Sequence, residues 1–118
     1  MTLVAQGKNA RKRSVWGHNT TTTTEIVYTC PANCVAELTY LHVHNKTGNT
    51  SIHIEWYISA DNYSSSYIDG KNLGAGEFVS FNDIELVLQS GDRIEITPSH
   101  AAHIDSILTV TETFVPVG

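Results

Sequence analysis

The stretch SIHIEWYIS, residues 51–59, alternates apolar and polar side chains without a break. Successive side chains of an extended chain point in opposite directions, so its apolar residues would share one face and its polar residues the other. The apolar residues are Ile52, Ile54, Trp56 and Ile58. A period of two over this length predicts a half-buried β-strand.

A second strand is predicted upstream, over residues 35–44, which end in the alternating pattern Tyr-Leu-His-Val-His. Residues 45–49 (NKTGN) between the two strands are turn formers, so the sequence predicts a β-hairpin. A register in which paired residue numbers sum to about 95 would place Val43 opposite Ile52 and Leu41 opposite Ile54. Both apolar sets then fall on one side, as a single buried face requires.

Further strands are predicted at residues 25–29, 77–81, 84–88, 93–97 and 104–114, and around Tyr67 and Ile68. Clusters of Gly, Pro, Asn and Asp separate them. No segment shows helical periodicity, so any helix is expected to be a single turn. The predicted fold class is all-β, a single antiparallel β-sandwich that is jelly-roll-like.

The charge distribution divides the chain. Its 118 residues suffice for one domain and carry a formal net charge of −5. Residues 1–24 contain four cations and no acid, whereas residues 25–118 carry 3 − 12 = −9. The cations are Lys8, Arg11, Lys12 and Arg13. Residues 1–24 show no sustained period and end in five threonines, so we predict an extended basic N-terminal arm with a Thr linker, and a sandwich of residues 25–118.

The arm requires an anionic partner if it binds anything. Nucleic acid is the usual target of clustered Lys and Arg, but the acidic body would be repelled by it, so no nucleic-acid partner is expected. An acidic protein surface, including that of a neighbouring copy, is the favoured partner, and a plain solvated tail is the alternative. No apolar run approaches the roughly 20 residues that span a bilayer, and no signal peptide is recognisable, so neither a membrane nor the usual export route is expected.

Three histidines define a candidate metal site. In the predicted hairpin, His42 and His53 are cross-strand neighbours, with His44 nearby, and three imidazoles could hold zinc. The alternative, which we favour, is that these are ordinary polar residues on the outer side of a strand. No metal and no cofactor is therefore expected.

The remaining chemistry-bearing residues do not predict an enzyme. Cys30 and Cys34 form a C-x3-C pattern, and two free thiols are expected because no secretion signal is present. Ser99, His100, His103 and Asp105 lie close in sequence, but without the motif context of a hydrolase. No catalytic residue is predicted.

Residues 61–67 (DNYSSSY) have the composition of an adaptable binding loop, in which Tyr63 and Tyr67 would supply contact area. A surface turn without function is the alternative. A carbohydrate-binding jelly roll would need an aromatic platform from Trp56, Tyr57 or Tyr63, although Trp56 falls on the apolar side of its strand.

Taken in order, two groups of motifs resemble small virion structural proteins of tailed bacteriophages. The first group is IVYTCPAN (residues 26–33) followed by LHVHN (residues 41–45) and Asn49-Thr50. The second is LGAGE (residues 73–77) followed by IELVLQSGDRI (residues 84–94). The likeness covers about residues 25–113 and consists of strands and turns.

This resemblance implies a non-enzymatic virion protein, assembled in the host cytoplasm. A capsid decoration or cement protein bound to the major capsid protein is the leading expectation, and a tail or neck adaptor or fibre-associated module is the alternative. The resemblance also implies self-association, with a homotrimer favoured. It transfers no active-site residue.

Overall fold

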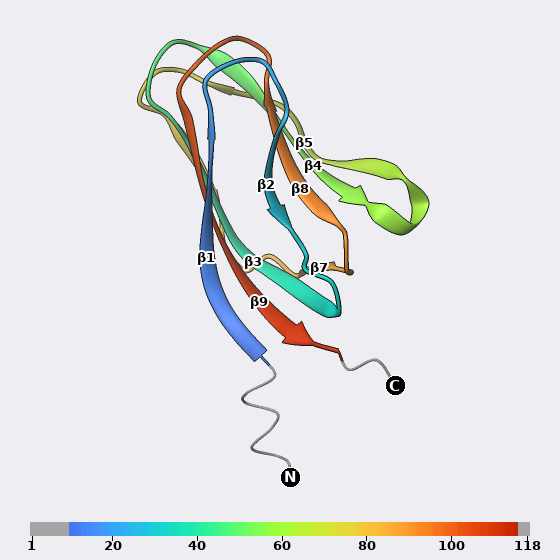
Figure 1. Ribbon diagram of the computed structural model, residues 1–118. Helices are drawn as coiled ribbons and strands as arrows, with labels where there is room; N and C mark the ends of the chain where they lie inside the picture. Colours follow the sequence, from blue (N-terminus) through green and yellow to red (C-terminus); the bar gives the residue numbers. More distant parts are fainter. Residues whose placement is uncertain (1–9, 116–118) are drawn as a thin grey trace.

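The computed structural model describes residues 10–115 of the chain as nine strands and one short 3-10 helix (Figure 1). The elements are β1 (Ala10–Asn19), β2 (Glu25–Thr29), β3 (Cys34–Asn45), β4 (Thr50–Ile58), η1 (Ser59–Asp61), β5 (Tyr63–Leu73), β6 (Phe78–Phe81), β7 (Leu86–Leu88), β8 (Arg93–Pro98) and β9 (Ile104–Phe114). Within these residues, no helix has the length and apolar character needed to cross a membrane. Most strands fall on the predicted segments, although β1 was not predicted as a strand, and the helix is a single turn.

The strands form two packed antiparallel sheets. The five-stranded sheet has the order β1-β9-β3-β6, with β7 also paired to β3, and the four-stranded sheet has the order β2-β8-β4-β5. From β1 to β4, each strand lies in the sheet opposite to that of its predecessor. Two sheets connected in this way make a jelly roll. The prediction of an all-β sandwich is confirmed.

The core lies between the inner faces of both sheets. Alternate residues of β3 and β9 are fully buried on one side, and Ile52 and Ile54 of β4 meet them from the other side. The largest buried aliphatic side chains are Leu38, Leu41, Val43, Leu88, Ile94, Ile96, Ile104, Leu108 and Val110. Each sheet has one face in the core and one face in solvent, which is why apolar and polar residues alternate in the sequence of its strands.

The hairpin predicted between β3 and β4 is wrong. β3 pairs with β9, β6 and β7, whereas β4 pairs with β5 and β8 in the other sheet. Asn45 directs the crossing, because its buried amide nitrogen donates hydrogen bonds to the carbonyls of Gly48 (2.9 Å) and Leu73 (3.0 Å). The apolar residues of the two strands share a side because they face each other across the core. Alternation alone cannot separate this arrangement from a hairpin.

The boundary predicted at Glu25 also differs from the structure. Residues 10–19 form β1, which pairs with β9 from Ala10 opposite Thr113 to Asn19 opposite Ile104. The segment is extended, as predicted, but it is an edge strand of the sandwich. Residues 1–9 lie outside the described part of the chain. Pairing with β9 satisfies backbone groups of β1 that a free arm would leave to water.

Gly17 is the point of closest approach between β1 and β2. A Cβ atom built at Gly17 would lie 2.2 Å from Cγ1 of Val27, well inside van der Waals contact. We expect Gly17→Ala to lower the free energy of unfolding by about 2 kcal/mol, because overpacking forces strands apart. In urea denaturation, Val27→Ala combined with Gly17→Ala should cost less than the sum of the two single changes.

The control for this prediction is Ser14→Ala, on the exposed side of the same strand, which should change stability by less than about 0.5 kcal/mol. Strict additivity of the Gly17 and Val27 changes would contradict the close contact.

Candidate functional site

The outer face of the five-stranded sheet is one of the two sheet faces that the sandwich turns away from its core. Its side chains come from β1, β9, β3 and β6, whose register places them in rows across the sheet. One row contains Trp16, Ile107, His42 and Ser80, and the next contains His18, Asp105, His44 and Phe78. We call these two rows, together with Tyr40 and Thr109 of the adjacent row, the outer A face.

The outer A face exposes large apolar side chains. Trp16 is 78% exposed, Phe78 60% and Ile107 46%. Trp16 lies directly opposite Ile107, so the two form one apolar strip at the β1–β9 edge. Phe78 packs against the His42 ring, with ring centroids 5.2 Å apart, and His42 stacks beside Tyr40. Single exposed apolar residues are ordinary, but a group on one flat face is typical of an interaction surface.

The candidate metal histidines are not brought together. His42 and His44 lie on the outer A face, whereas His53 lies on the outer side of β4 in the other sheet. His42 Nδ1 is 2.6 Å from Ser80 Oγ, and His53 Nδ1 is 2.9 Å from Asp69 Oδ1. Among residues 10–115, no group of three or more His, Cys, Asp or Glu is arranged to hold a metal ion. The hypothesis failed because it depended on the incorrect hairpin.

A different polar cluster occupies one end of the outer A face. Asp105 lies between His18, 2.7 Å from its Nδ1, and Lys46, 3.0 Å from its Nζ. The hydrogen bonds from these two side chains lower the pKa of Asp105. Asp105, the acid considered with Ser99 and His100, is engaged in this cluster, so these three residues do not form a catalytic triad. His100 Nδ1 contacts Ser99 Oγ at 3.1 Å.

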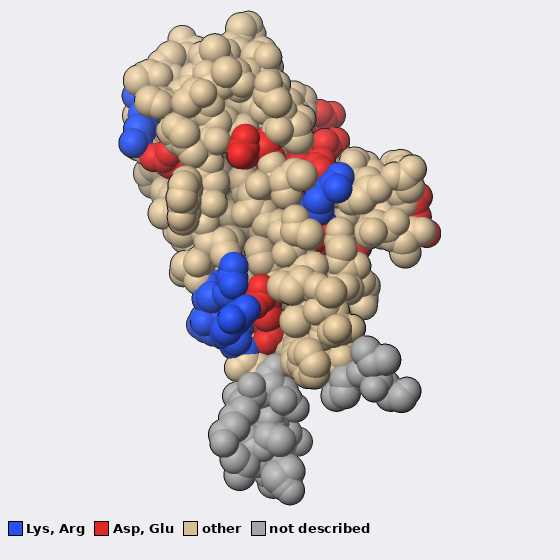
Figure 2. Space-filling model, viewed as in Figure 1, with Lys and Arg blue, Asp and Glu red and all other residues tan. Residues whose placement is uncertain are grey.

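Two of the four predicted arm cations are engaged within the molecule. Arg11 Nη2 donates a 2.6 Å hydrogen bond to Oε1 of Glu112, and Arg13 Nε lies 3.8 Å from Oε2 of the same carboxylate. Tyr28 Oη donates to Oε2 at 2.6 Å. Figure 2 shows the basic side chains at this end of the molecule in a compact group with acidic atoms directly beside them. The arm cations were predicted to bind an acidic partner. For Arg11 and Arg13, the carboxylate that they contact is Glu112 of the same chain.

The pKa values at this site follow from burial and hydrogen bonding. Burial alone would raise the pKa of Glu112, but the hydrogen bonds from Tyr28 and Arg11 outweigh it and the pKa is lowered. Burial, together with the bond to Glu112, raises the pKa of Tyr28. Lys12 points the opposite way along β1 from Arg11 and Arg13, toward the solvent side of the sheet. Lys8 lies outside the described residues.

Tyr63 and Tyr67 are only partly available as a binding loop. Tyr63 begins β5 at the tip of the hairpin that projects from the body in Figure 1, and it is 63% exposed. Tyr67 packs edge-on against Phe81, with centroids 5.4 Å apart, and helps to close the side of the sandwich.

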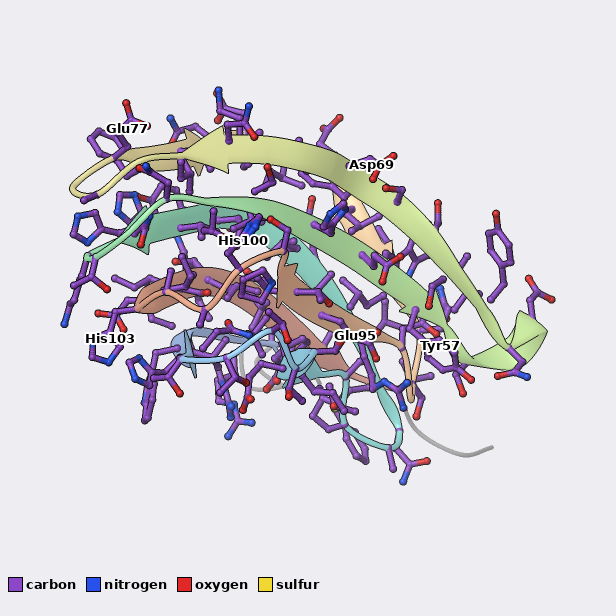
Figure 3. All side chains as sticks on the ribbon, turned by 90° about the horizontal axis from the view of Figure 1, so that it is seen from above. Tyr57, Asp69, Glu77, Glu95, His100 and His103 are labelled. Carbon is purple, nitrogen blue, oxygen red and sulfur yellow. The ribbon has the colours of Figure 1, made fainter. Side chains whose placement is uncertain are left out.

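The aromatic residues considered for sugar binding also have structural contacts. Trp56 packs against the core, as its position in the alternation predicts. The Tyr57 ring lies 4.0 Å below the guanidinium of Arg93. Figure 3 shows Tyr57 with Glu95 toward the hairpin end of the four-stranded sheet, and Asp69 along β5.

Both cysteines are free thiols: Cys30 lies in the connection between β2 and β3, and Cys34 is the first residue of β3. Cys30 is buried, and burial together with the neighbouring Cys34 raises its pKa to about 11. We expect iodoacetamide at pH 8 to modify Cys34 and to react with Cys30 at least about 100-fold more slowly, because the thiolate is the nucleophile. Peptide mass spectrometry measures both sites.

Two controls accompany the labelling. Unfolding in guanidinium should make both thiols react, and Cys34→Ser should leave the folded protein nearly unlabelled. Equal labelling of both sites in the folded protein would contradict the burial of Cys30.

The sequence reasoning did not identify Trp16, Ile107 or Phe78. Trp16 lies in the segment that was read as an arm, where Lys12, Ser14, Trp16 and His18 do alternate with Val15, Gly17 and Asn19. Because polar residues occur at both sets of alternating positions, the segment lacks the apolar–polar pattern of a half-buried strand. A cross-strand view of β1 and β9 would have revealed the apolar strip.

Comparison with known proteins supports the fold. No known family profile matches the sequence, and no curated protein matches it. A chain from Bacillus endospore appendages, described as disulfide-linked pili, is similar in structure with a TM-score of 0.58 and 14% identity, over 92% of this chain and 90% of that chain. A chain from the capsid of Helicobacter pylori bacteriophage KHP30 gives a TM-score of 0.54 and 10% identity, over 92% of this chain and 94% of that chain. The chain thus shares a jelly-roll-like sandwich with capsid and pilus subunits.

Proposed function

We propose that this chain is a non-enzymatic structural subunit of a bacteriophage virion, and that it decorates the head by binding the lattice of the major capsid protein. The observation that carries the proposal is the outer A face, on which Trp16, Ile107 and Phe78 are exposed. Exposed apolar side chains grouped on one face are typical of an interaction surface, and a subunit would bury them on assembly. The fold shared with capsid and pilus chains supports the same role.

The use of the charged side chains also supports a structural role. Asp105 stabilises the end of the outer A face through His18 and Lys46, and Glu112 holds β1 through Arg11. Both carboxylates are therefore engaged by contacts within the fold. We therefore assign attachment chiefly to the outer A face, with Lys12 at its margin, and not to a free basic arm.

The test is to purify virus particles from the cells that produce this chain and to count its copies by quantitative mass spectrometry. A decoration protein should be present in hundreds of copies, because it follows the capsid lattice. Trp16→Ser should lower its occupancy on particles at least tenfold, whereas Tyr63→Ser, at another exposed aromatic residue, should leave occupancy unchanged. Absence from particles would overturn the proposal.

A tail or neck module is the second candidate, and the projecting β4–β5 hairpin favours it. Its tip carries Tyr63 away from the body of the sandwich (Figure 1). In that case the copy number would be a small multiple of three or six, and Tyr63→Ser, but not Trp16→Ser, would release the protein from particles.

A further inference from the structure

We infer that a hollow between β1 and β2 receives an extended acidic segment of the major capsid protein, which adds to the edge of β1 as a further strand. The inference rests on the proposed function and deepens it, because it names the kind of contact made beside the outer A face and the chemistry of the chain that makes it. Three observations carry it: the free edges of two strands, the hollow along them and the charge that the hollow presents.

The first observation is that β1 and β2 are both edge strands. Among the described residues, β1 pairs with β9 alone and β2 pairs with β8 alone, so one side of each strand has no strand beside it in its sheet. β1 is the more regular of the two, because its ten residues pair with β9 without a bulge, whereas the register of β2 shifts between Ile26 and Tyr28. Backbone groups along a regular edge can pair with an incoming strand.

The second observation is a hollow of about 440 Å³ along these edges. β1 and β2 lie side by side (Figure 1), and the hollow is lined by residues 13–16 of β1 and 26–29 of β2. A hollow over the face of a sheet would touch alternate residues of a strand, since successive side chains point to opposite faces. Four consecutive residues on each strand therefore indicate that the backbone edges border this hollow.

The third observation is the charge at the hollow. Arg13 is the one charged residue among those that line it. Its Nε lies 3.8 Å from Glu112 Oε2, beyond hydrogen-bond distance, whereas Arg11 and Tyr28 each donate to that carboxylate at 2.6 Å. Glu112 is thus already paired, and the Arg13 side chain, which is 43% exposed, is available to a second carboxylate.

The same charges select the occupant. Arg11, Lys12 and Arg13 place three cations and no acid on β1. Like charges on paired strands repel, so this edge disfavours a second copy of β1 and favours an acidic segment. One set of side chains of an added strand would lie on the side of Arg13, and the alternate set on the side of Trp16. The segment should therefore carry acidic residues on one side and apolar residues on the other.

The test is an NMR titration of the full chain with an eight-residue peptide, acetyl-TEVEVEVT-amide, whose glutamates and valines lie on opposite sides when it is extended. We expect Kd of about 100 μM, with amide shifts concentrated at residues 13–16. A peptide with lysine in place of each glutamate should bind at least tenfold more weakly. Absence of binding at about 2 mM peptide, shifts centred on another strand, or equal affinity for the lysine peptide would each overturn the inference.

Two further peptides test the addition of a strand. Methyl groups on the three glutamate amide nitrogens block one edge of the extended peptide, and methyl groups on the three valine nitrogens block the other, because the N–H groups of alternate residues point to opposite edges. One of these peptides should lose at least tenfold in affinity, and the other should retain it. Equal affinities would contradict pairing through one edge.

Two variants of the protein test the charge at the hollow. Arg13→Gln removes the cation, and Ile26→Glu places an acid among the lining residues at a side chain that is 50% exposed. Each should raise Kd at least fivefold, and circular dichroism should show an unchanged fold for Ile26→Glu. Lys71→Gln, which removes a cation from the edge strand β5, is the control and should leave Kd unchanged. An equal loss with Lys71→Gln would show attraction by net charge alone and would refute the inference.

The outcome is separable from that of the proposed function. A protein that does not bind the peptide but is present in hundreds of copies on particles would refute strand addition and leave the decoration role standing. A protein that binds the peptide at residues 13–16 but is absent from particles would do the reverse.

Discussion

Asp92→Ala is expected to lower the free energy of unfolding by about 4 kcal/mol, and Tm by roughly 15 °C. Asp92 is almost fully buried, and its carboxylate accepts hydrogen bonds from Trp56 Nε1 (3.1 Å), the Ser59 amide (3.0 Å) and the Gln89 amide (3.0 Å). Removal of the carboxylate leaves three donors without a partner at the end of the sandwich. Chemical denaturation followed by circular dichroism measures the loss.

Two comparisons sharpen this prediction. Asp92→Asn keeps the size of the side chain and one carbonyl oxygen, so it should lower the free energy of unfolding by about half as much. The remaining cost arises because the new NH₂ group faces a hydrogen-bond donor and cannot accept from it. Asp69→Ala removes an exposed acid of the same type, at 80% side-chain exposure, and should change stability by less than about 0.5 kcal/mol. A loss below about 1 kcal/mol for Asp92→Ala would mean that the carboxylate does not hold this end together.

Glu112→Ala is expected to cost about 3 kcal/mol and to loosen the first half of β1. The change removes the acceptor of Tyr28 and the counter-charge of Arg11 and Arg13, and it leaves a buried hydroxyl without its partner. Hydrogen exchange should rise at Arg11 to Arg13 and stay unchanged in β8. Glu37→Ala, at an exposed acid of β3, is the control and should alter neither quantity.

The pH dependence of stability provides a second measurement on Glu112. Its pKa is lowered in the folded protein, so its contribution is complete at neutral pH and is lost as the pH falls through the folded value. The wild type should therefore lose stability below about pH 5, and Glu112→Ala should show a shallower decline over the same range. Parallel pH profiles for the two proteins would contradict the assignment.

The strands of this fold could be predicted from the sequence because each sheet has one dry and one solvated face. Residues 51–59 show this alternation most clearly, and they form β4 as expected. The pairing of strands could not be predicted, because the alternation is the same whether the chain returns in the same sheet or crosses to the other. The buried amide of Asn45 stabilises the crossing by donating to two carbonyls, and the alternation gives no sign of these contacts.

The candidate site was harder to predict for a related reason. Lys12 and Arg13 are neighbours in sequence, and a count of charge treats them alike. The pleat of β1 separates them, because Arg13 turns toward Glu112 and Lys12 turns outward. Trp16 was likewise assigned to a segment outside the fold, so its proximity to Ile107 could be found only after β1 was paired with β9.

The position of β1 next to β9 has a consequence for the order of folding. Arg11 and Glu112 are separated by 101 residues along the chain. At about 5 to 20 residues per second, a ribosome would complete β9 roughly 5 to 20 seconds after β1. Such distant pairing raises contact order and slows folding. β1 is therefore synthesised well before its partner, and until β9 emerges the backbone groups of β1 that will pair with it are open to water, chaperones and other chains.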